Sequence, residues 1–156
     1  MQIDLIAVGK RMPDWIESAC SEYLKRLPKQ VQLSVLEINP ANRTRKNSVD
    51  NFKQQEEQRI LEAIKPDSML IVLDEGGQPV SSKGLANKLE TWIDNQQAVS
   101  VVIGGADGLS ERLKNDANET WSLSGLTLPH GLVRVLFVEQ VYRAWSILDN
   151  HPYHRE

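Results

Sequence analysis

The sequence lacks several features that mark whole classes of protein. It has one cysteine, Cys20, so no internal disulfide can form. The apolar run over residues 3–8 contains Asp4 and is far shorter than the roughly 20 residues that a membrane-spanning helix needs. No basic region or small-residue cleavage site accompanies it, as a secretory signal would require. No part is repetitive or disordered in composition, so we expect a cytosolic, globular protein.

Positive charge is also scarce. The 156 residues carry 18 Lys and Arg against 21 Asp and Glu, a net charge of -3. Nonspecific nucleic-acid binding depends on neutralising phosphates with Lys and Arg, so this composition argues against it but leaves specific recognition open. A basic cluster at residues 43–46 is more typical of a solvated loop. Cys20 lies in a helical pattern, where a small buried residue is more common than a nucleophile.

Short apolar segments alternate with helical ones along the chain. Val, Ile and Leu are concentrated in five strand-like runs, at residues 3–8, 33–38, 69–73, 99–103 and 120–123. Helical patterns begin near Pro13, after Ser48 and near Ser81 or Ser82. This alternation predicts an α/β fold whose mainly parallel sheet is flanked by helices. With 40% hydrophobic residues, the chain suits a single domain over residues 1–156.

The last helical segment is apolar nearly all round. Seven residues form one stripe with steps of three and four, and they are Val133, Leu136, Phe137, Val141, Ala144, Trp145 and Leu148. Other apolar residues lie off that stripe, and few polar positions precede Asp149. Such a helix needs cover on more than one side, and in a small domain the spare cover commonly comes from another subunit. We therefore interpret it as half core and half dimer interface, in preference to a helix buried within one chain.

A glycine-rich turn follows the most apolar strand. Gly104, Gly105 and Gly108 would let the backbone approach a ligand closely at the carboxyl end of a strand, although such turns often only reverse the chain. The turn has neither the Lys-Ser/Thr of a P-loop nor the spacing of a dinucleotide fingerprint. Asp107 would repel a polyphosphate. A ligand with an adenosine and a cationic portion fits better, which favours S-adenosylmethionine.

The segment at residues 123–128 supports the same ligand. It mixes backbone donors and acceptors with apolar side chains, which is the environment that a purine usually occupies. The tail contains His151 and His154, but no cysteine or convergent carboxylates complete a ligand set, so we expect no metal. His130, after Pro129, is interpreted as a capping or hydrogen-bonded structural residue.

A series of C-terminal motifs resembles the pattern of one known protein family. They are Ile103-Gly104-Gly105-Ala106-Asp107-Gly108-Leu109, Trp121-Ser122-Leu123-Ser124-Gly125-Leu126-Thr127-Leu128-Pro129-His130, Arg134-Val135, Glu139-Gln140-Val141-Tyr142-Arg143-Ala144 and Tyr153-His154-Arg155. Earlier segments match as well, at Ala7-Val8-Gly9-Lys10, at Glu22-Tyr23-Leu24-Lys25-Arg26-Leu27 and at Leu73-Asp74. Over its whole length the chain resembles the pseudouridine N3-methyltransferases of large-subunit 23S rRNA, in the SPOUT superfamily.

This resemblance implies a C-terminal trefoil knot, a homodimer and S-adenosylmethionine as the methyl donor, bound by three loops. The implied cofactor-binding residues are Leu73, Gly104, Leu123, Ser124, Gly125, Leu126, Thr127 and Leu128. The family often has Gly-Lys after the middle strand, whereas this chain has Asp74-Glu75-Gly76-Gly77-Gln78, with Gln78 in place of that lysine.

The polar tail contains residues that could take part in methyl transfer. The N3 position of a pseudouridine must lose its proton to become a good nucleophile, and a base or a cation nearby would assist. We hypothesise that the tail lies over the methyl donor, where His154 and Arg155 favour the deprotonated base and Tyr153 packs on it. His151 and Arg143 are candidates for binding the RNA, although Arg143 could equally pair with Glu139, four residues earlier.

Two other functions remain open on the sequence. One is an α/β module that docks on RNA or on the ribosome without catalysis and uses the glycine-rich turn only structurally. The other is a small-molecule methyltransferase on the same scaffold. Binding of S-adenosylmethionine would exclude the first, and methyl transfer to ribosomes would exclude the second.

Overall fold

Among the residues that the computed structural model describes, which are 1–42, 48–105 and 107–155, five strands form one open sheet in the order β2-β1-β4-β3-β5. The strands are β1 (Gln2–Val8), β2 (Gln32–Ile38), β3 (Met69–Pro79), β4 (Val99–Ile103) and β5 (Glu119–Ser122). Every neighbouring pair is parallel, which confirms the predicted fold class. The basic cluster at 43–46 and Ala106 lie outside the described residues, and the knot stays a prediction.

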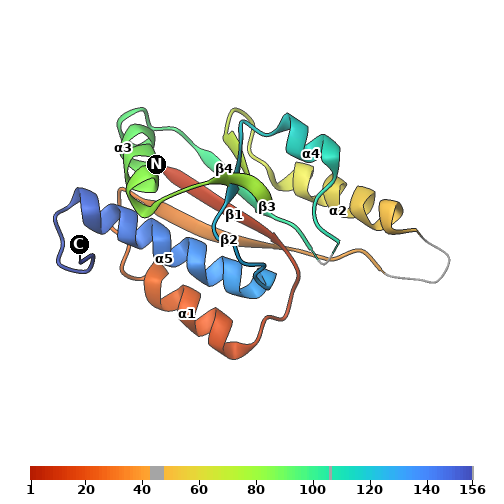
Figure 1. Ribbon diagram of the computed structural model, residues 1–156, viewed down its shortest axis with the longest axis horizontal. Helices are drawn as coiled ribbons and strands as arrows, with labels where there is room; N and C mark the ends of the chain where they lie inside the picture. Colours follow the sequence, from red (N-terminus) through yellow and green to blue (C-terminus); the bar gives the residue numbers. More distant parts are fainter. Residues whose placement is uncertain (43–47, 106, 156) are drawn as a thin grey trace.

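Helices cover both faces of the sheet (Figure 1). One face carries α1 (Asp14–Leu24), α3 (Ser82–Asp94) and α5 (His130–Leu148), whereas the other carries α2 (Val49–Ala63) and α4 (Glu111–Asp116). None of the helices in the described part of the chain is both long and apolar enough to cross a membrane.

Alternation along the strands explains the two layers. Ile3, Leu5 and Ala7 of β1 pack against α1, α3 and α5, while Ile6 and Val8 face α2 and α4. Both faces are therefore buried, and the strands are apolar at consecutive positions as the sequence predicts.

Cys20 of α1 is part of the larger core and is buried, as expected. Burial raises the pKa of its thiol above the ordinary value, against a smaller opposite effect of the Arg134 charge. The reactive thiolate is therefore disfavoured, as expected for a structural cysteine.

Serine caps fix where several helices begin. Ser48 accepts a hydrogen bond from the Asn51 amide at the start of α2, and Ser81 accepts one from the Gly84 amide at the start of α3. Ser110 does the same for α4, which the sequence did not predict. The middle strand also runs on to Pro79, beyond the predicted end at residue 73.

A bulge in β3 explains the longer strand. Leu73 and Gln78 both pair with Trp121 of β5, so residues 74–77 loop out at the carboxyl end of the sheet. A Cβ atom on Gly77 would lie 2.6 Å from the carbonyl carbon of Trp121 and 2.8 Å from that of Thr120. Only glycine lets the two backbones approach this closely.

We expect Gly77→Ala to lower the free energy of unfolding by about 1–3 kcal/mol, because a methyl group forced against backbone must displace β5. Urea unfolding followed by tryptophan fluorescence measures the change. Gly125→Ala is the matched control, since nothing lies within 4 Å of its added Cβ. Equal stability of the two variants would contradict the role of Gly77.

The final helix obtains most of its cover within the chain. It lies between α1 and α3 (Figure 1), and none of its residues is fully exposed. An outer ridge at helical spacing remains only partly buried, formed by Leu132, Leu136, Gln140, Arg143 and Ile147. The flanks of α5 are thus covered in part by α1 and α3, and its role as a dimer interface stays a prediction.

Candidate active site

A pocket lies at the carboxyl edge of the sheet, where open α/β sheets bind ligands. Its volume is about 330 Å³, and it is built by the segments that follow β3, β4 and β5 together with the start of α5. All of the predicted cofactor-binding residues except Gly125 line it, and they are Leu73, Gly104, Leu123, Ser124, Leu126, Thr127 and Leu128. The fold thus brings together residues that lie up to 55 positions apart in the sequence.

The segment after β4 forms one wall mainly with backbone. A Cβ atom on Gly104 would lie 2.8 Å from Cγ of Leu109 and 2.9 Å from the carbonyl carbon of Gly108, so no side chain fits there. The Gly108 amide donates to the Gly105 carbonyl at 3.0 Å, which closes a tight turn. This glycine-rich turn therefore exposes backbone groups to the pocket, as the sequence predicts.

The segment after β5 forms the opposite wall and is held by its own serines. The Ser122 hydroxyl donates to the Ser124 carbonyl at 2.9 Å, and the Leu126 amide donates to the Ser124 hydroxyl at 2.9 Å. Leu126 remains 74% exposed at the rim of the pocket. An apolar side chain in this position can cover a ligand that enters.

The charge in the pocket comes from β3. Asp74 and Glu75 line it, and among the described lining residues there is no Lys or Arg. The sequence assigned the repulsion of phosphate to Asp107, but that residue does not belong to the described lining. The negative charge of the pocket thus comes from two other carboxylates, which the bulge turns toward it.

His130 also lines the pocket as the first residue of α5. The helix begins after Pro129 without a side-chain cap, and within the described chain the His130 side chain makes no hydrogen bond. Its interpretation as a capping or hydrogen-bonded residue is therefore wrong. Its imidazole instead contributes a polar group to the wall of the site.

Arg134, one turn further along α5, ties the helix to the first two strands. Only 2% of it is exposed; its guanidinium donates to the Gly9 carbonyl at 2.8 Å and to the Glu37 carboxylate at 2.9 Å. Among the residues that the structure describes, no group accepts a hydrogen bond from its Nε atom. In the sequence, Arg134 was notable only as part of a motif shared with the family, and no role was predicted for it. In the structure it lies behind the wall of the pocket.

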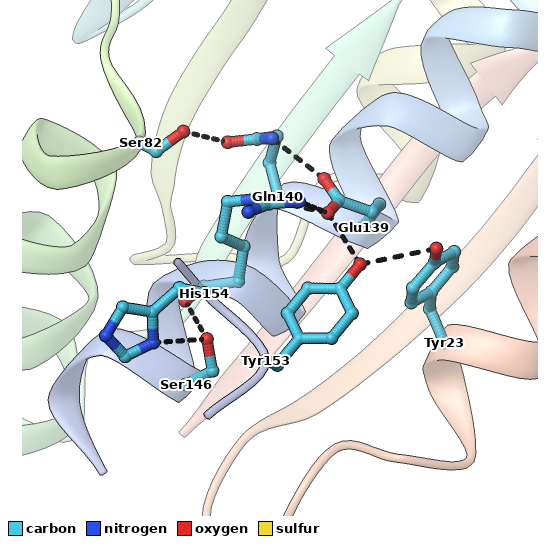
Figure 2. Close-up of polar contacts among 8 residues, drawn as sticks. Tyr23, Ser82, Glu139, Gln140, Ser146, Tyr153 and His154 are labelled. Carbon is cyan, nitrogen blue, oxygen red and sulfur yellow. Dashed lines mark hydrogen bonds and ion pairs between the residues drawn. The ribbon is translucent and has the colours of Figure 1, made fainter. Parts of the chain in front are cut away.

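The polar tail folds back along the C-terminal half of α5, as far as Glu139 (Figure 2). The Tyr153 hydroxyl donates to the Glu139 carboxylate at 2.8 Å and lies 3.3 Å from the Tyr23 hydroxyl. Burial, followed by those two hydrogen-bond partners, raises the pKa of Tyr153 well above its ordinary value. Tyr153 therefore remains a neutral hydrogen-bond donor at physiological pH.

Arg143 forms the ion pair with Glu139 that its spacing allowed, with Nη2 2.6 Å and Nε 3.0 Å from the same carboxylate oxygen. The hydrogen bonds to Glu139 raise the pKa of Arg143 further. The guanidinium carbon also lies 5.0 Å from the centre of the Tyr153 ring. About a third of the side chain stays exposed, so the pairing leaves part of the cation accessible to a partner.

His154 is anchored to α5 in one tautomer (Figure 2). The Ser146 hydroxyl donates its single hydrogen to the Arg143 carbonyl at 2.7 Å, so its contact of 3.1 Å with His154 requires Nδ1 to donate. In the neutral imidazole, Nε2 then has a free lone pair. His151 accepts from the Tyr153 amide, and Arg155 is exposed.

The pocket and the tail are separated within one chain. His130 lines the pocket, whereas His154 contacts Ser146 near the other end of the same helix. At 1.5 Å per residue, these ends lie about 24 Å apart along the helix. A single chain therefore does not place its tail over its own pocket. Within the described residues, no cluster of His, Cys, Asp or Glu is arranged to hold a metal ion.

A wholly parallel sheet with a loop-built pocket at its carboxyl edge defines an α/β protein of the ligand-binding, enzyme-like class. The family model described as "Predicted SPOUT methyltransferase" matches residues 1–154. The chain belongs to the SPOUT methyltransferase family.

Relatives extend over the full chain. A protein of Methylobacillus flagellatus is 48% identical over 156 residues, and one of Neisseria meningitidis serogroup C is 50% identical over 156 residues. Each match covers 100% of both proteins, and both relatives are named ribosomal RNA large subunit methyltransferase H. A solved structure of a probable methylase family protein from Haemophilus influenzae has a TM-score of 0.59 at 11% identity, covering 99% of this chain and 70% of that one. That likeness concerns the fold alone.

Proposed function

We propose that this protein is an S-adenosylmethionine-dependent methyltransferase that modifies N3 of a pseudouridine in 23S rRNA of the large ribosomal subunit. One observation carries the proposal: the pocket that the three loops build is lined by the residues that the rRNA methyltransferase motifs single out. The full-length relatives that are named large-subunit rRNA methyltransferases support the same substrate.

The pocket suits the proposed methyl donor in size and chemistry. Its volume falls within the range of about 300–1,000 Å³ that is usual for small-molecule sites. Leucine side chains and exposed backbone groups suit an adenine ring, while the carboxylates of Asp74 and Glu75 suit a cation and repel polyphosphates. When bound, S-adenosylmethionine supplies a methyl group activated by its positively charged sulfur.

The residues of the tail account for the rest of the chemistry. His154 Nε2, which the contact with Ser146 leaves free, accepts the N3 proton of the target base. Arg155 stabilises the negative charge that develops on the base, and Tyr153 and His151 pack and position it. The exposed part of the Arg143 guanidinium binds the RNA backbone.

A homodimer would complete this site. The tail and the pocket of one chain lie at opposite ends of α5, so two copies whose α5 helices run antiparallel would place the tail of each near the pocket of the other. The partly buried ridge of Leu132, Leu136 and Ile147 supplies the apolar surface for that contact. With a net charge of -3 per chain, the dimer recognises a folded ribosomal surface in the cytoplasm in preference to naked RNA.

Methyl transfer to ribosomes tests the proposal directly. Ribosomes from cells that lack the gene are incubated with the protein and labelled S-adenosylmethionine, and the modified nucleotide is identified by mass spectrometry. We expect one methylated pseudouridine in 23S rRNA. Absence of heat on titration with S-adenosylmethionine would instead indicate a docking module, and cofactor binding without transfer to ribosomes would indicate a small-molecule methyltransferase.

A further inference from the structure

Glu75 has an unusual place in the pocket. It belongs to the bulge of β3, residues 74–77, which leaves the sheet and turns into the wall of the site. Its carboxylate accepts a hydrogen bond from the Thr127 hydroxyl at 2.9 Å. Since Thr127 lies in the segment after β5, this contact joins two walls of the pocket and holds the carboxylate at its mouth.

Within the described part of the chain, no neighbour balances the charge of Glu75. Asp74, the other acidic residue of the wall, lies 3.7 Å from the Lys114 ammonium group and accepts from the Gly76 amide at 3.0 Å. Among the described residues, no cation lies within ion-pair distance of Glu75. Glu75 thus supplies the uncompensated negative charge of the pocket.

We propose that Glu75 is a specificity-determining residue that makes the pocket bind the cationic methyl donor more tightly than its neutral product. This inference rests on the proposed function. S-adenosylmethionine carries one net positive charge at neutral pH, from its sulfonium and ammonium groups and its carboxylate. Loss of the methyl group leaves S-adenosylhomocysteine, a neutral thioether of nearly the same shape. Shape can scarcely separate the two, whereas an unpaired carboxylate attracts the sulfonium, a charge that only the donor carries.

The size of the effect follows from the exposure of the carboxylate. Two unit charges several ångströms apart interact appreciably near a protein surface and only weakly in bulk water, and Glu75 is exposed to solvent at the pocket mouth. We therefore expect its charge to change donor affinity by about three- to tenfold. Salt should reduce the preference, because it screens an exposed pair.

Calorimetric titration of both ligands tests this role. Glu75→Gln keeps an oxygen that accepts from Thr127 and removes only the charge. We expect this variant to bind S-adenosylmethionine about three- to tenfold more weakly and to bind S-adenosylhomocysteine as the wild-type protein does. The ratio of the two dissociation constants is the decisive quantity, and it requires no turnover.

Two control variants separate charge from structure. Thr127→Val breaks the hydrogen bond but keeps the carboxylate, so any weakening should affect both ligands alike. Glu90→Gln, on the exposed surface of α3, makes the same change in net charge away from the pocket and should leave both affinities unchanged. An unaltered ratio in Glu75→Gln, or an equal loss for both ligands, would overturn the inference. A wild-type protein that binds neither ligand would overturn the proposed function as well.

Discussion

Replacing His154 with alanine is expected to slow methyl transfer to ribosomes by about 100-fold or more, the usual contribution of a positioned general base. The variant loses the Nε2 lone pair that the contact with Ser146 leaves free to take the N3 proton. Single-turnover transfer of a labelled methyl group, with enzyme in excess over ribosomes, measures the chemical step.

Two companion variants make this test specific. Ser146→Ala keeps the imidazole but removes the partner of Nδ1, so it should reduce the rate less than His154→Ala does. Cofactor affinity, measured by calorimetry, should change far less than the rate in both, since neither His154 nor Ser146 is among the residues that line the pocket. Near-normal turnover in both His154→Ala and Arg155→Ala would rule out the assignment of the chemistry to the tail.

Arg134→Ala is expected to lower the free energy of unfolding by about 3 kcal/mol. The variant breaks the hydrogen bonds to Gly9 and Glu37, removes a nearly fully buried side chain and leaves a cavity beside Cys20. Urea denaturation at matched protein concentration measures the change, because stability would depend on concentration in a dimer.

Two substitutions show which part of Arg134 matters. Glu37→Gln should cost less than about 1 kcal/mol, because the Glu37 side chain is 35% exposed and water can replace its partner. Arg134→Met keeps most of the buried volume and removes the unpartnered Nε, so its cost should fall between the other two. A loss below about 1 kcal/mol in Arg134→Ala would mean that the buried guanidinium contributes no net stability.

The alternation of apolar runs was enough to predict the parallel sheet, because strands covered on both faces need apolar residues at consecutive positions. Serine caps located the starts of α2 and α3 for a similar local reason. The bulge after Leu73 was out of reach, since it depends on how closely Gly77 approaches the backbone of Trp121 in another strand. Helix α4 has six residues, too few to show a clear period.

The candidate site, like the fold, could be predicted from the sequence only in part. Motif residues after strands predicted the pocket, because the carboxyl ends of parallel strands meet at one edge. In the sequence, Glu75 belongs only to a segment that departs from the family pattern. Its side chain points into the pocket because of the bulge, which the sequence does not reveal. The separation of the tail from the pocket follows from the length and packing of α5, together with the turn that folds Tyr153 back onto Tyr23. No local pattern encodes that arrangement.

The position of β4 also affects how the chain folds. Ile3 pairs with Leu33 on one side, but on the other side it pairs with Val99, almost a hundred residues away. During synthesis from the N-terminus, β1 and β2 can therefore associate long before β4 emerges, and one edge of β1 stays open in the meantime. Inserting β4 between β1 and β3, both of which are synthesised earlier, costs chain entropy before any contact compensates for it, so folding should be slow for a chain of this size. An apolar strand exposed for this period is a natural target for chaperones.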